Sequence, residues 1–336
     1  MQQNSYFLAK QVKRLKKQNI LSMDKIKNIS KCDYIIFCLP TPLKNNAPDL
    51  TFIISAFNRM FKHLKKNQTI ILESTVFTGA TSEIFVKKLN KKLNVGVCHP
   101  GIHSTHTGLV KNAPNCYWIE KKPLQKNLRE SLKREVYCEN DANCFTLSEA
   151  IDGSCKNYKI VFGVILGSGC GGGLVINKKI VTGTNGLGGE WGHNQLPYPA
   201  AKKEKLDTNI LRESEIESFI SGYGLSKNFN KKYGKKLKTH EIFKAYRNHD
   251  IDAEKIIEEF KINLAMSLST IINILDPEVF VFGGGMSNEI DFFPEIEDLV
   301  RKYVVGQEYE GIFLKPKYGD ASGVRGAARL GRSSFY

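Results

Sequence analysis

Two short stretches hold side chains suited to acid–base chemistry on a hydroxyl-rich ligand. In ENDAN (139–143), Asp141 stands between Asn140 and Asn143, where a strand-like run gives way to a helix-like one. A carboxylate in such a turn can accept a proton from a substrate hydroxyl, while the flanking amides hold hydroxyls or fix the loop. A helix start with Asp141 as the N-cap explains the same residues equally well. The local pattern leaves both interpretations open.

The second stretch, GEWGH (189–193), places Glu190 and His193 in a glycine-rich loop, and Glu217 opens the helix-like segment ESFISG. Sugar hydroxyls both donate and accept hydrogen bonds, so two carboxylates and an imidazole suit a polyol ligand. A loop glutamate or histidine is usually only solvated. We therefore interpret these residues as sugar contacts only because the other motifs accompany them.

Glycines are concentrated in GSGCGGG (167–173), between two apolar runs. Without Cβ atoms in the way, backbone N–H groups can surround a phosphate. A wide hairpin turn is the alternative, but five glycines in seven residues exceed what a turn needs. GGGMS (283–287) follows a buried run and would let an adenosine lie against the main chain, although a simple helix-start turn explains it as well.

Apolar periodicity predicts the elements that position these motifs. DYIIFCL (33–39), TIILEST (69–75) and VGVCH (95–99) are typical of strands buried on both faces, and helical spacing lies between them, as at 49–66. Strands alternating with helices predict a parallel α/β unit. Downstream the predicted elements are a strand, turn and helix at 134–150, a hairpin at 159–181, helices at 213–225, 240–248 and 252–275, and a strand at 278–287.

The bulk composition narrows the function classes. With 336 residues, 41% of them hydrophobic and 25% charged, the chain has an ordinary globular composition. A net charge of +15 suggests nucleic acid, but the lysines are spread along the chain, which favours solvated surfaces that attract anionic nucleotides. Eight scattered cysteines without a C-x-x-C pair indicate buried thiols. No signal-peptide core or membrane-length apolar run is present, so we expect a cytoplasmic protein without membrane or nucleic-acid partners.

From about Gly96 onward, these motifs resemble the ROK family of bacterial sugar kinases, and within it the fructokinase or mannokinase branch. The matching stretches are PGIHSTHTGLVKNA, REVYCENDANCFTLSEA, VILGSGCGGGLVINKKIVTG, GGEWGHNQLP, IESFISGYGL, INILDPEVFVFGGGMSN and YGDASGVRGAA. They cover nearly all of residues 96–330 in order and spacing. The resemblance implies an α/β, actin-like (ribonuclease H-like) ATPase fold with two lobes.

The resemblance also implies the chemistry and the site residues. ATP with Mg²⁺ would be the phosphoryl donor and a hexose, fructose or mannose, the acceptor at a primary hydroxyl. Asp141 would be the catalytic base, with Asn140, Glu190, His193 and Glu217 as hexose contacts. The implied nucleotide contacts are Gly167, Ser168, Gly169, Gly171, Gly172, Gly283, Gly284 and Gly285. A homodimer is an open expectation.

The chain departs from the family pattern at a zinc knuckle, C-x-C-G-x-x-G-C-x-E, whose fourth ligand is the GH histidine. The aligned stretch here is TNILRESEIE (208–217), so Thr208, Ile210 and Glu215 stand where thiolates would be. A Cys₃His site cannot form from these residues, and we expect no structural zinc.

The second departure is the N-terminal segment. The family begins with a D-x-G-G-T phosphate loop, and no such sequence occurs upstream of residue 96. Residues 32–89 instead resemble the middle of the cofactor domain of UDP-sugar 6-dehydrogenases, in which Thr41, Ser74 and Thr75 would lie near NAD. The preceding G-x-G-x-x-G is absent, which disfavours NAD binding and dehydrogenase activity.

The predicted organisation is therefore a partial Rossmann-like segment at 1–95 and a ROK-type region at 96–336. The latter holds the remainder of an incomplete N-terminal lobe to about residue 150 and a C-terminal lobe from about 159. The predicted junction lies within 91–96. The expected function is ATP-dependent hexose phosphorylation, weakened by the missing loop. The alternative is a catalytically inactive sugar- or nucleotide-binding chimera from a rearranged gene.

Overall fold

The computed structural model describes residues 26–32, 34–37, 43–44, 47–48, 51–65, 68–72, 94–113, 116–197 and 215–331. The chain divides into two compact units. One comprises residues 1–94 with 128–135, and the other comprises 95–127 with 136–336. Each is described by itself below.

In the first unit, two parallel strands are accompanied by an amphipathic helix. Strands β1 (Tyr34–Phe37) and β4 (Thr69–Leu72) pair in parallel, as the apolar runs predicted. Ile53, Phe57 and Met60 of α2 (Thr51–Met60) recur at helical spacing and are buried together with Ile29. The buried Gln68 amide donates to the carbonyls of Ile29 and Cys32, both at 2.6 Å. The short elements of this unit are η1 (Ile26–Lys31), η2 (Phe61–His63), β2 (Leu43–Lys44) and β3 (Ala47–Pro48).

A five-stranded sheet forms the centre of the second unit, in the order β11-β10-β9-β12-β13. The strands are β9 (Ile160–Leu166), β10 (Cys170–Ile176), β11 (Lys179–Ile180), β12 (Val279–Gly283) and β13 (Ile312–Leu314). β9 and β10 form the predicted hairpin, and β12 lies parallel to β9. The turn is shorter than the glycine run suggested, because the glycines at 171–173 belong to β10.

Alternate residues of the central strands face opposite sides of the sheet, as the two-residue period of a strand requires. Phe162, Phe280 and Phe282 belong to the core that includes α9. Val161 and Val281 belong to the core beneath α4 and α11. The strands are therefore apolar on both faces, because helices cover both.

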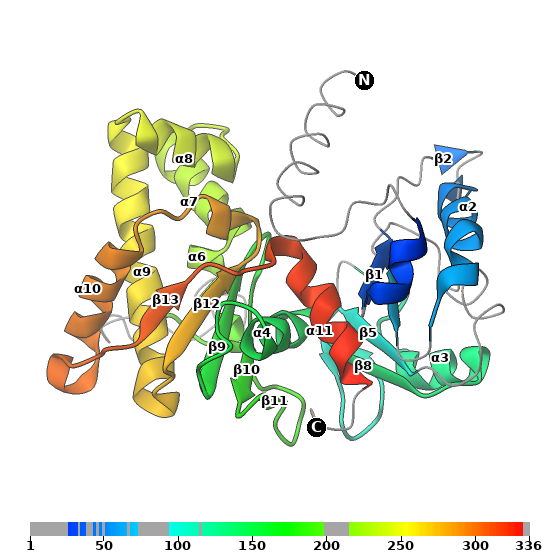
Figure 1. The fold of residues 1–336 in the computed structure, drawn as a ribbon. Coiled ribbons are helices and arrows are strands. Elements are labelled where there is room, and N and C mark those ends of the chain that lie inside the picture. The colour runs from blue at the N-terminus through cyan, green and yellow to red at the C-terminus, as the bar shows by residue number, and fades with distance from the viewer. Residues whose placement is uncertain are drawn as a thin grey trace. The chain divides into compact units, whose positions relative to one another are not determined.

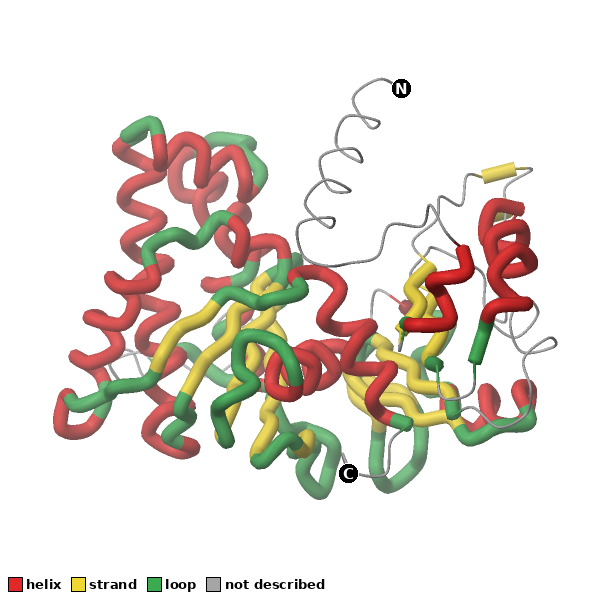
Figure 2. The backbone as a smooth tube through the Cα atoms, in the orientation of Figure 1, coloured by secondary structure: helices red, strands yellow, loops and turns green. Residues whose placement is uncertain are grey.

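Helices occupy most of the remaining chain (Figures 1 and 2). They are α3 (Leu124–Leu132), α4 (Asp141–Ile151), α6 (Glu217–Ile220), α7 (Gly222–Tyr233), α8 (Thr239–Arg247), α9 (Ile251–Leu275), α10 (Phe293–Tyr303) and α11 (Ser322–Leu330), with short turns η5 (Trp191–His193), η6 (Gly285–Asn288), η7 (Val305–Gln307) and η8 (Gly319–Ala321). The helix predicted at 213–225 is split, because Ser221 ends α6 and caps α7 by accepting the N–H of Gly224.

Strands β5 (Val95–His99) and β8 (Val136–Asn140) form a parallel pair, and β6 (Ile102–His103) pairs with β7 (Val110–Lys111). Helix α11 lies alongside α4 (Figure 1). A Cβ at Gly326 would lie 1.7 Å from the carbonyl oxygen of Cys144, and one at Gly96 equally close to that of Ala327. These two glycines let α11 approach both α4 and β5 at backbone distance.

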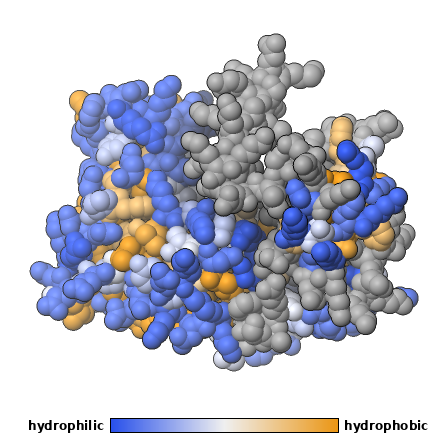
Figure 3. Space-filling model, in the orientation of Figure 1, coloured by the Kyte–Doolittle hydropathy of each residue, from blue (hydrophilic) through white to orange (hydrophobic). Residues whose placement is uncertain are grey.

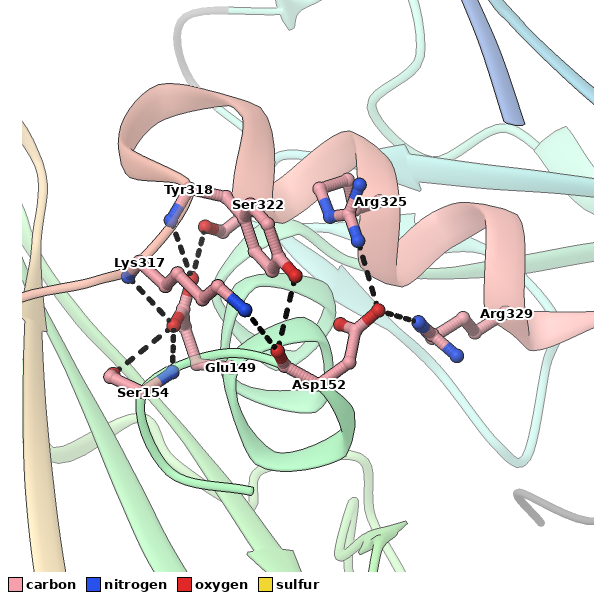
Figure 4. Close-up of polar contacts among 8 residues, drawn as sticks. All are labelled: Glu149, Asp152, Ser154, Lys317, Tyr318, Ser322, Arg325 and Arg329. Carbon is pink, nitrogen blue, oxygen red and sulfur yellow. Dashed lines mark hydrogen bonds and ion pairs between the residues drawn. The ribbon is translucent and has the colours of Figure 1, made fainter. Parts of the chain in front are cut away.

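The buried carboxylate of Glu149 connects the end of α4 by hydrogen bonds to the segment that leads into α11 (Figure 4). Glu149 accepts hydrogen bonds from the backbone N–H groups of Ser154 at 2.8 Å, Lys317 at 2.9 Å and Tyr318 at 3.3 Å, and from the Ser322 hydroxyl at 2.6 Å. Its side chain is fully buried. Glu149 thereby fixes α4, the helix that begins at Asp141.

A neighbouring ion-pair cluster joins the same two helices. Asp152 accepts hydrogen bonds from the guanidinium groups of Arg325, at 2.9 Å, and Arg329. The Tyr318 hydroxyl donates to the Asp152 carbonyl at 3.1 Å (Figure 4). These contacts form a second connection between α4 and α11.

We predict that Glu149→Ala destabilises the protein strongly. The substitution leaves several buried donors without an acceptor, and each such donor costs about 1–3 kcal/mol, so the free energy of unfolding should fall by about 3 kcal/mol or more. Urea denaturation measures the change, with the exposed Glu310→Ala as the matched control, which should shift stability by less than about 0.5 kcal/mol. Equal midpoints for the two variants would contradict a structural role for Glu149.

Hydrophilic residues cover most of the coloured surface in Figure 3, and hydrophobic residues reach it in small groups. Within the described part of the chain, no helix is both long and apolar enough to cross a membrane.

Candidate functional site

In ENDAN the helix N-cap is Asn140 and not Asp141. The Asn140 side-chain oxygen accepts the N–H groups of Ala142 at 2.8 Å and Asn143 at 3.2 Å, and its Nδ2 donates to the Gly101 carbonyl at 3.1 Å. The N-cap interpretation of Asp141 was therefore wrong. Asp141 is the first helical residue, and its carboxylate lies at the positive end of α4. One Nδ2 hydrogen of Asn140 remains for a ligand.

The surroundings of Asp141 raise the proton affinity of its carboxylate. The side chain is open to solvent on one side, while the protein packed around it desolvates the carboxylate and raises its pKa. A hydrogen bond of 2.9 Å from the Ala142 N–H acts in the opposite direction. A raised pKa brings a carboxylate nearer to the range in which a general base works well.

Glu139, the residue before the cap, supports this turn from the interior. Burial raises the pKa of Glu139, against hydrogen bonds from the Asn140 N–H at 2.8 Å and the Asn143 side chain at 3.1 Å. Asn143 was predicted to hold a substrate hydroxyl or to fix the loop. Its side chain is buried and donates to Glu139, so it fixes the loop. Glu139 was not predicted as a site residue, and its strand position gave no signal for this role.

The GEWGH loop places Glu190 and His193 close enough to Asp141 for the charge of Asp141 to act on the Glu190 carboxylate. Burial raises the pKa of the Glu190 carboxylate, and the neighbouring charges of Asp141 and Glu217 raise it further, whereas His193 lowers it. The His193 Nε2 lies 3.8 Å from Glu190 Oε2. Three carboxylates and an imidazole thus share one electrostatic neighbourhood, which is an arrangement suited to a polyol.

Glu217 connects this cluster to the turn of the β9–β10 hairpin. One of its carboxylate oxygens accepts the Cys170 N–H at 2.7 Å, and a Cβ at Gly169 would lie 2.6 Å from the same atom. The predicted sugar-contacting carboxylate and the predicted phosphate-binding turn are therefore in direct contact.

Four of the glycines predicted to contact the nucleotide form two contrasting pairs. Gly172 and Gly283 are buried, and a Cβ would meet the Trp191 ring at 2.8 Å in the first case and Phe145 at 2.5 Å in the second. Packing alone therefore requires glycine at these two positions. Gly167 and Gly285 have open space where a Cβ would project, so a ligand can approach the backbone there.

The open glycines lie on segments that converge. The Gly222 N–H at the start of α7 donates to the Gly167 carbonyl at 2.7 Å. Gly284, at φ +82°, passes so close to Leu166 that a Cβ would lie 2.4 Å from its carbonyl oxygen. The hairpin turn, which includes Ser168 and Gly169, and the stretch after β12 thus form one continuous backbone surface, and Gly171 follows on β10.

A zinc knuckle does not fit this chain. Thr208 and Ile210 supply no thiolate, and both lie outside the described residues. The residues predicted to lie near NAD, Thr41, Ser74 and Thr75, also lie outside the described residues. Glu215 instead contacts His193, with its Oε2 3.1 Å from Nδ1. Within the part of the chain that the structure describes, no group of three or more potential ligands is placed to hold a metal ion.

Asn112 is a site residue that was not predicted. Its Nδ2 lies 3.2 Å from His193 Nε2, and its backbone adopts φ 55°, a left-handed conformation that asparagine tolerates. It belongs to the stretch PGIHSTHTGLVKNA. Its place in that motif-bearing stretch was the available sequence signal, because the left-handed backbone conformation is known only from the structure.

Comparison with known families gives two matches. The ROK family model matches residues 62–333, and the NAD-binding-domain model of the UDP-glucose/GDP-mannose dehydrogenase family matches residues 5–112. The two matches overlap at 62–112, and the predicted junction at 91–96 falls within that overlap. Its position stays a prediction.

Individual relatives agree with the larger match. An N-acetyl-D-glucosamine kinase of Histophilus somni is 38% identical over 250 residues, which are 73% of this chain and 82% of that protein. The ROK hexokinase of Thermus thermophilus superposes with a TM-score of 0.61 at 23% identity, covering 81% of this chain and 85% of the other. A Streptomyces griseus ROK glucokinase in complex with glucose and AMPPNP superposes with a TM-score of 0.58 at 20% identity, covering 87% of this chain and 89% of the other. The fold is thus the actin-like ATPase fold of sugar kinases, and the chain belongs to the ROK family.

Proposed function

We propose that this protein is an ATP-dependent sugar kinase that phosphorylates a primary hydroxyl of N-acetylglucosamine. The observation that carries the proposal is the grouping of Glu190 with His193, 3.8 Å away, and with Asp141 and Glu217, whose charges act on the Glu190 carboxylate. Together with Asn140, these are the residues that the sequence predicted as catalytic base and sugar contacts. They come from three separate segments of the chain.

In the proposed reaction, Asp141 removes the proton from the sugar hydroxyl as its oxygen attacks the terminal phosphorus of ATP. The bond between that phosphorus and the ADP oxygen breaks, and the sugar phosphate and ADP leave. Catalysis of this step rests mainly on positioning and charge neutralisation. Glu190, Glu217, His193 and Asn140 fix the sugar so that the reacting hydroxyl faces Asp141.

The nucleotide would lie along the backbone of Gly167–Gly169 and Gly284–Gly285, which is open at Gly167 and Gly285. Gly167 and Gly285 offer space for close approach, and the N terminus of α7 at Gly222 lies beside them. Mg²⁺ bound with ATP would supply neutralisation of the phosphate charges. The turn contacts Glu217, so nucleotide and sugar would occupy adjoining positions.

The choice of sugar rests on the relatives. The sequence suggested fructose or mannose, whereas the Histophilus somni relative is an N-acetyl-D-glucosamine kinase at 38% identity. This identity is high enough to make N-acetylglucosamine the first substrate to test. Fructose and mannose remain the alternatives from the resemblance to the fructokinase or mannokinase branch.

A coupled ADP-release assay with N-acetylglucosamine, N-acetylmannosamine, glucose, mannose and fructose tests the proposal. We expect sugar-dependent ADP release with the highest kcat/KM for N-acetylglucosamine. The rate should be low, because loss of even one preorganised charge-stabilising donor costs about 10²–10³-fold and residues 1–95 contain no D-x-G-G-T loop. A folded protein without turnover on any of these sugars would refute it.

The second candidate function is sugar or nucleotide binding without turnover. The observation that favours it is the absence of the D-x-G-G-T sequence from residues 1–95, where a dehydrogenase-like segment stands instead. Titration calorimetry with N-acetylglucosamine and AMPPNP separates the candidates. Binding of both ligands without ADP release would support the binding protein. NAD-dependent oxidation is disfavoured, because no G-x-G-x-x-G occurs in residues 1–32.

A further inference from the structure

His193 is held on both sides of its ring by side chains with defined hydrogen-bonding roles. Its Nδ1 lies 3.1 Å from a carboxylate oxygen of Glu215, and its Nε2 lies 3.2 Å from Nδ2 of Asn112. An ionised carboxylate only accepts hydrogen bonds, so Nδ1 must carry a hydrogen. An amide nitrogen only donates, so Nε2 must present its lone pair. Both hydrogen-bonding neighbours therefore specify the same neutral tautomer. The Glu190 carboxylate oxygen lies 3.8 Å from Nε2, beyond hydrogen-bonding distance.

Glu215 is itself placed by the backbone. Residues Gln195 and Glu215 form an antiparallel β-bridge, and the Ile216 N–H donates to the Asn194 carbonyl at 2.8 Å. The Ile216 side chain is buried in the main core. The loop that carries His193 and the segment that carries Glu215 are thus joined immediately beside the pair, which makes their contact a built feature of the fold.

The position of Glu215 gives this contact a functional meaning. In the family pattern a thiolate stands there and orients the GH histidine through a metal, but the ligands for such a metal are missing from this sequence. We propose that Glu215 is a positioning residue that replaces the metal. It holds His193 in the Nδ1–H tautomer, in which Nε2 is an acceptor. The Asn112 amide occupies Nε2 in this structure, and a hydroxyl or amide N–H of the sugar would take its place. The contact with sugar rests on the proposed function, whereas the tautomer does not.

An ordinary surface ion pair is the competing explanation. The side chains of His193 and Glu215 are 42% and 23% exposed, and exposed pairs contribute little to stability. The chain contains a matched example, since His249 Nδ1 also lies 3.1 Å from Glu254 Oε1 at exposures of 87% and 43%. That pair is a control of the same chemistry and the same distance.

The test uses the full chain with ¹⁵N-labelled histidine at mildly alkaline pH, with His193→Gln to assign the resonance. We expect the ring-nitrogen shifts of His193 to report the Nδ1–H tautomer in the wild type. In Glu215→Met, which keeps the length but removes the acceptor, the Nε2–H tautomer should appear, because the Asn112 amide can then turn to present its oxygen to Nε2. Glu215→Gln keeps an acceptor oxygen and should restore the wild-type tautomer.

Kinetics provide the second readout. Glu215→Met should raise the KM for the sugar by about tenfold with little change in kcat, as expected for loss of one oriented hydrogen bond. Glu215→Gln should restore the KM, and Glu254→Gln should leave it unchanged. A wild-type Nε2–H tautomer, or a tautomer unaffected by Glu215→Met, would overturn the inference. Failure of the proposed function appears separately, as absence of turnover while the resonances still decide the tautomer.

Discussion

Asp141→Asn is expected to lower kcat for sugar phosphorylation by about 10²–10⁴-fold, the usual contribution of a general base. The asparagine side chain retains the shape of Asp141 at the start of α4 but has no site that can take up the hydroxyl proton. The KM for the sugar should change far less, because Asn140, Glu190 and His193 remain in place. Coupled ADP release measures both constants.

The fold should tolerate this substitution. Burial raises the folded-state pKa of Asp141 above its unfolded value. The stability that such a group contributes is present below the unfolded pKa and is lost as the pH rises through the folded pKa. At neutral pH the ionised carboxylate therefore destabilises the folded state, and asparagine removes this cost. The melting temperature should be unchanged or slightly higher.

Asp291→Asn, at an exposed position, serves as the control for loss of a carboxylate elsewhere. It should leave kcat, KM and melting temperature at their wild-type values. Asp141→Asn with wild-type kcat would exclude Asp141 as the base. A large fall in melting temperature would instead indicate that the variant had lost its structure.

Replacing residues 1–94 with the corresponding N-terminal segment of the Histophilus somni relative is expected to raise kcat about 10²-fold or more. The resemblance to the ROK family implies that this segment carries the D-x-G-G-T phosphate loop, which residues 1–95 of this chain lack. Preorganised donors at a phosphate are each worth about 10²–10³ in rate. The exchange point at 94 coincides with the boundary between the two compact units.

The exchanged protein is compared with the wild type by ADP release on N-acetylglucosamine at saturating ATP. The same exchange combined with Asp141→Asn is the control, and it should show little of the gain. A folded exchange protein with an unchanged kcat would show that the missing loop does not limit the rate. A gain that survives Asp141→Asn would show that the activity does not use the proposed base.

Segments with strong periodicity were predictable from sequence. Strand β5 begins and ends at the predicted residues 95 and 99, and α9 and the β9–β10 hairpin lie where apolar periodicity placed them. Such patterns are local, because burial on one or both faces of an element repeats with its own period. The break between α6 and α7 was missed, because it depends on a single serine cap within a continuous helical pattern.

Glycines and caps were predicted less well, because their roles depend on contacts far away in sequence. The glycine at 172 looked like part of a phosphate loop, yet it makes room for Trp191. Asp141 was a plausible N-cap from sequence, but the structure gives that role to Asn140, which also donates to the distant Gly101 carbonyl. Neither neighbour is recognisable from the local sequence.

The sequence by itself determined the residue types of the proposed site, namely Asp141, Glu190, His193 and Glu217. It also determined the absence of the knuckle thiolates and of a D-x-G-G-T sequence in residues 1–95, since these are properties of composition and order. Only the tertiary structure decided which groups meet. It joined Glu217 to the hairpin turn and Glu215 to His193, because hydrogen bonds form between atoms about 3 Å apart however far apart they stand along the chain.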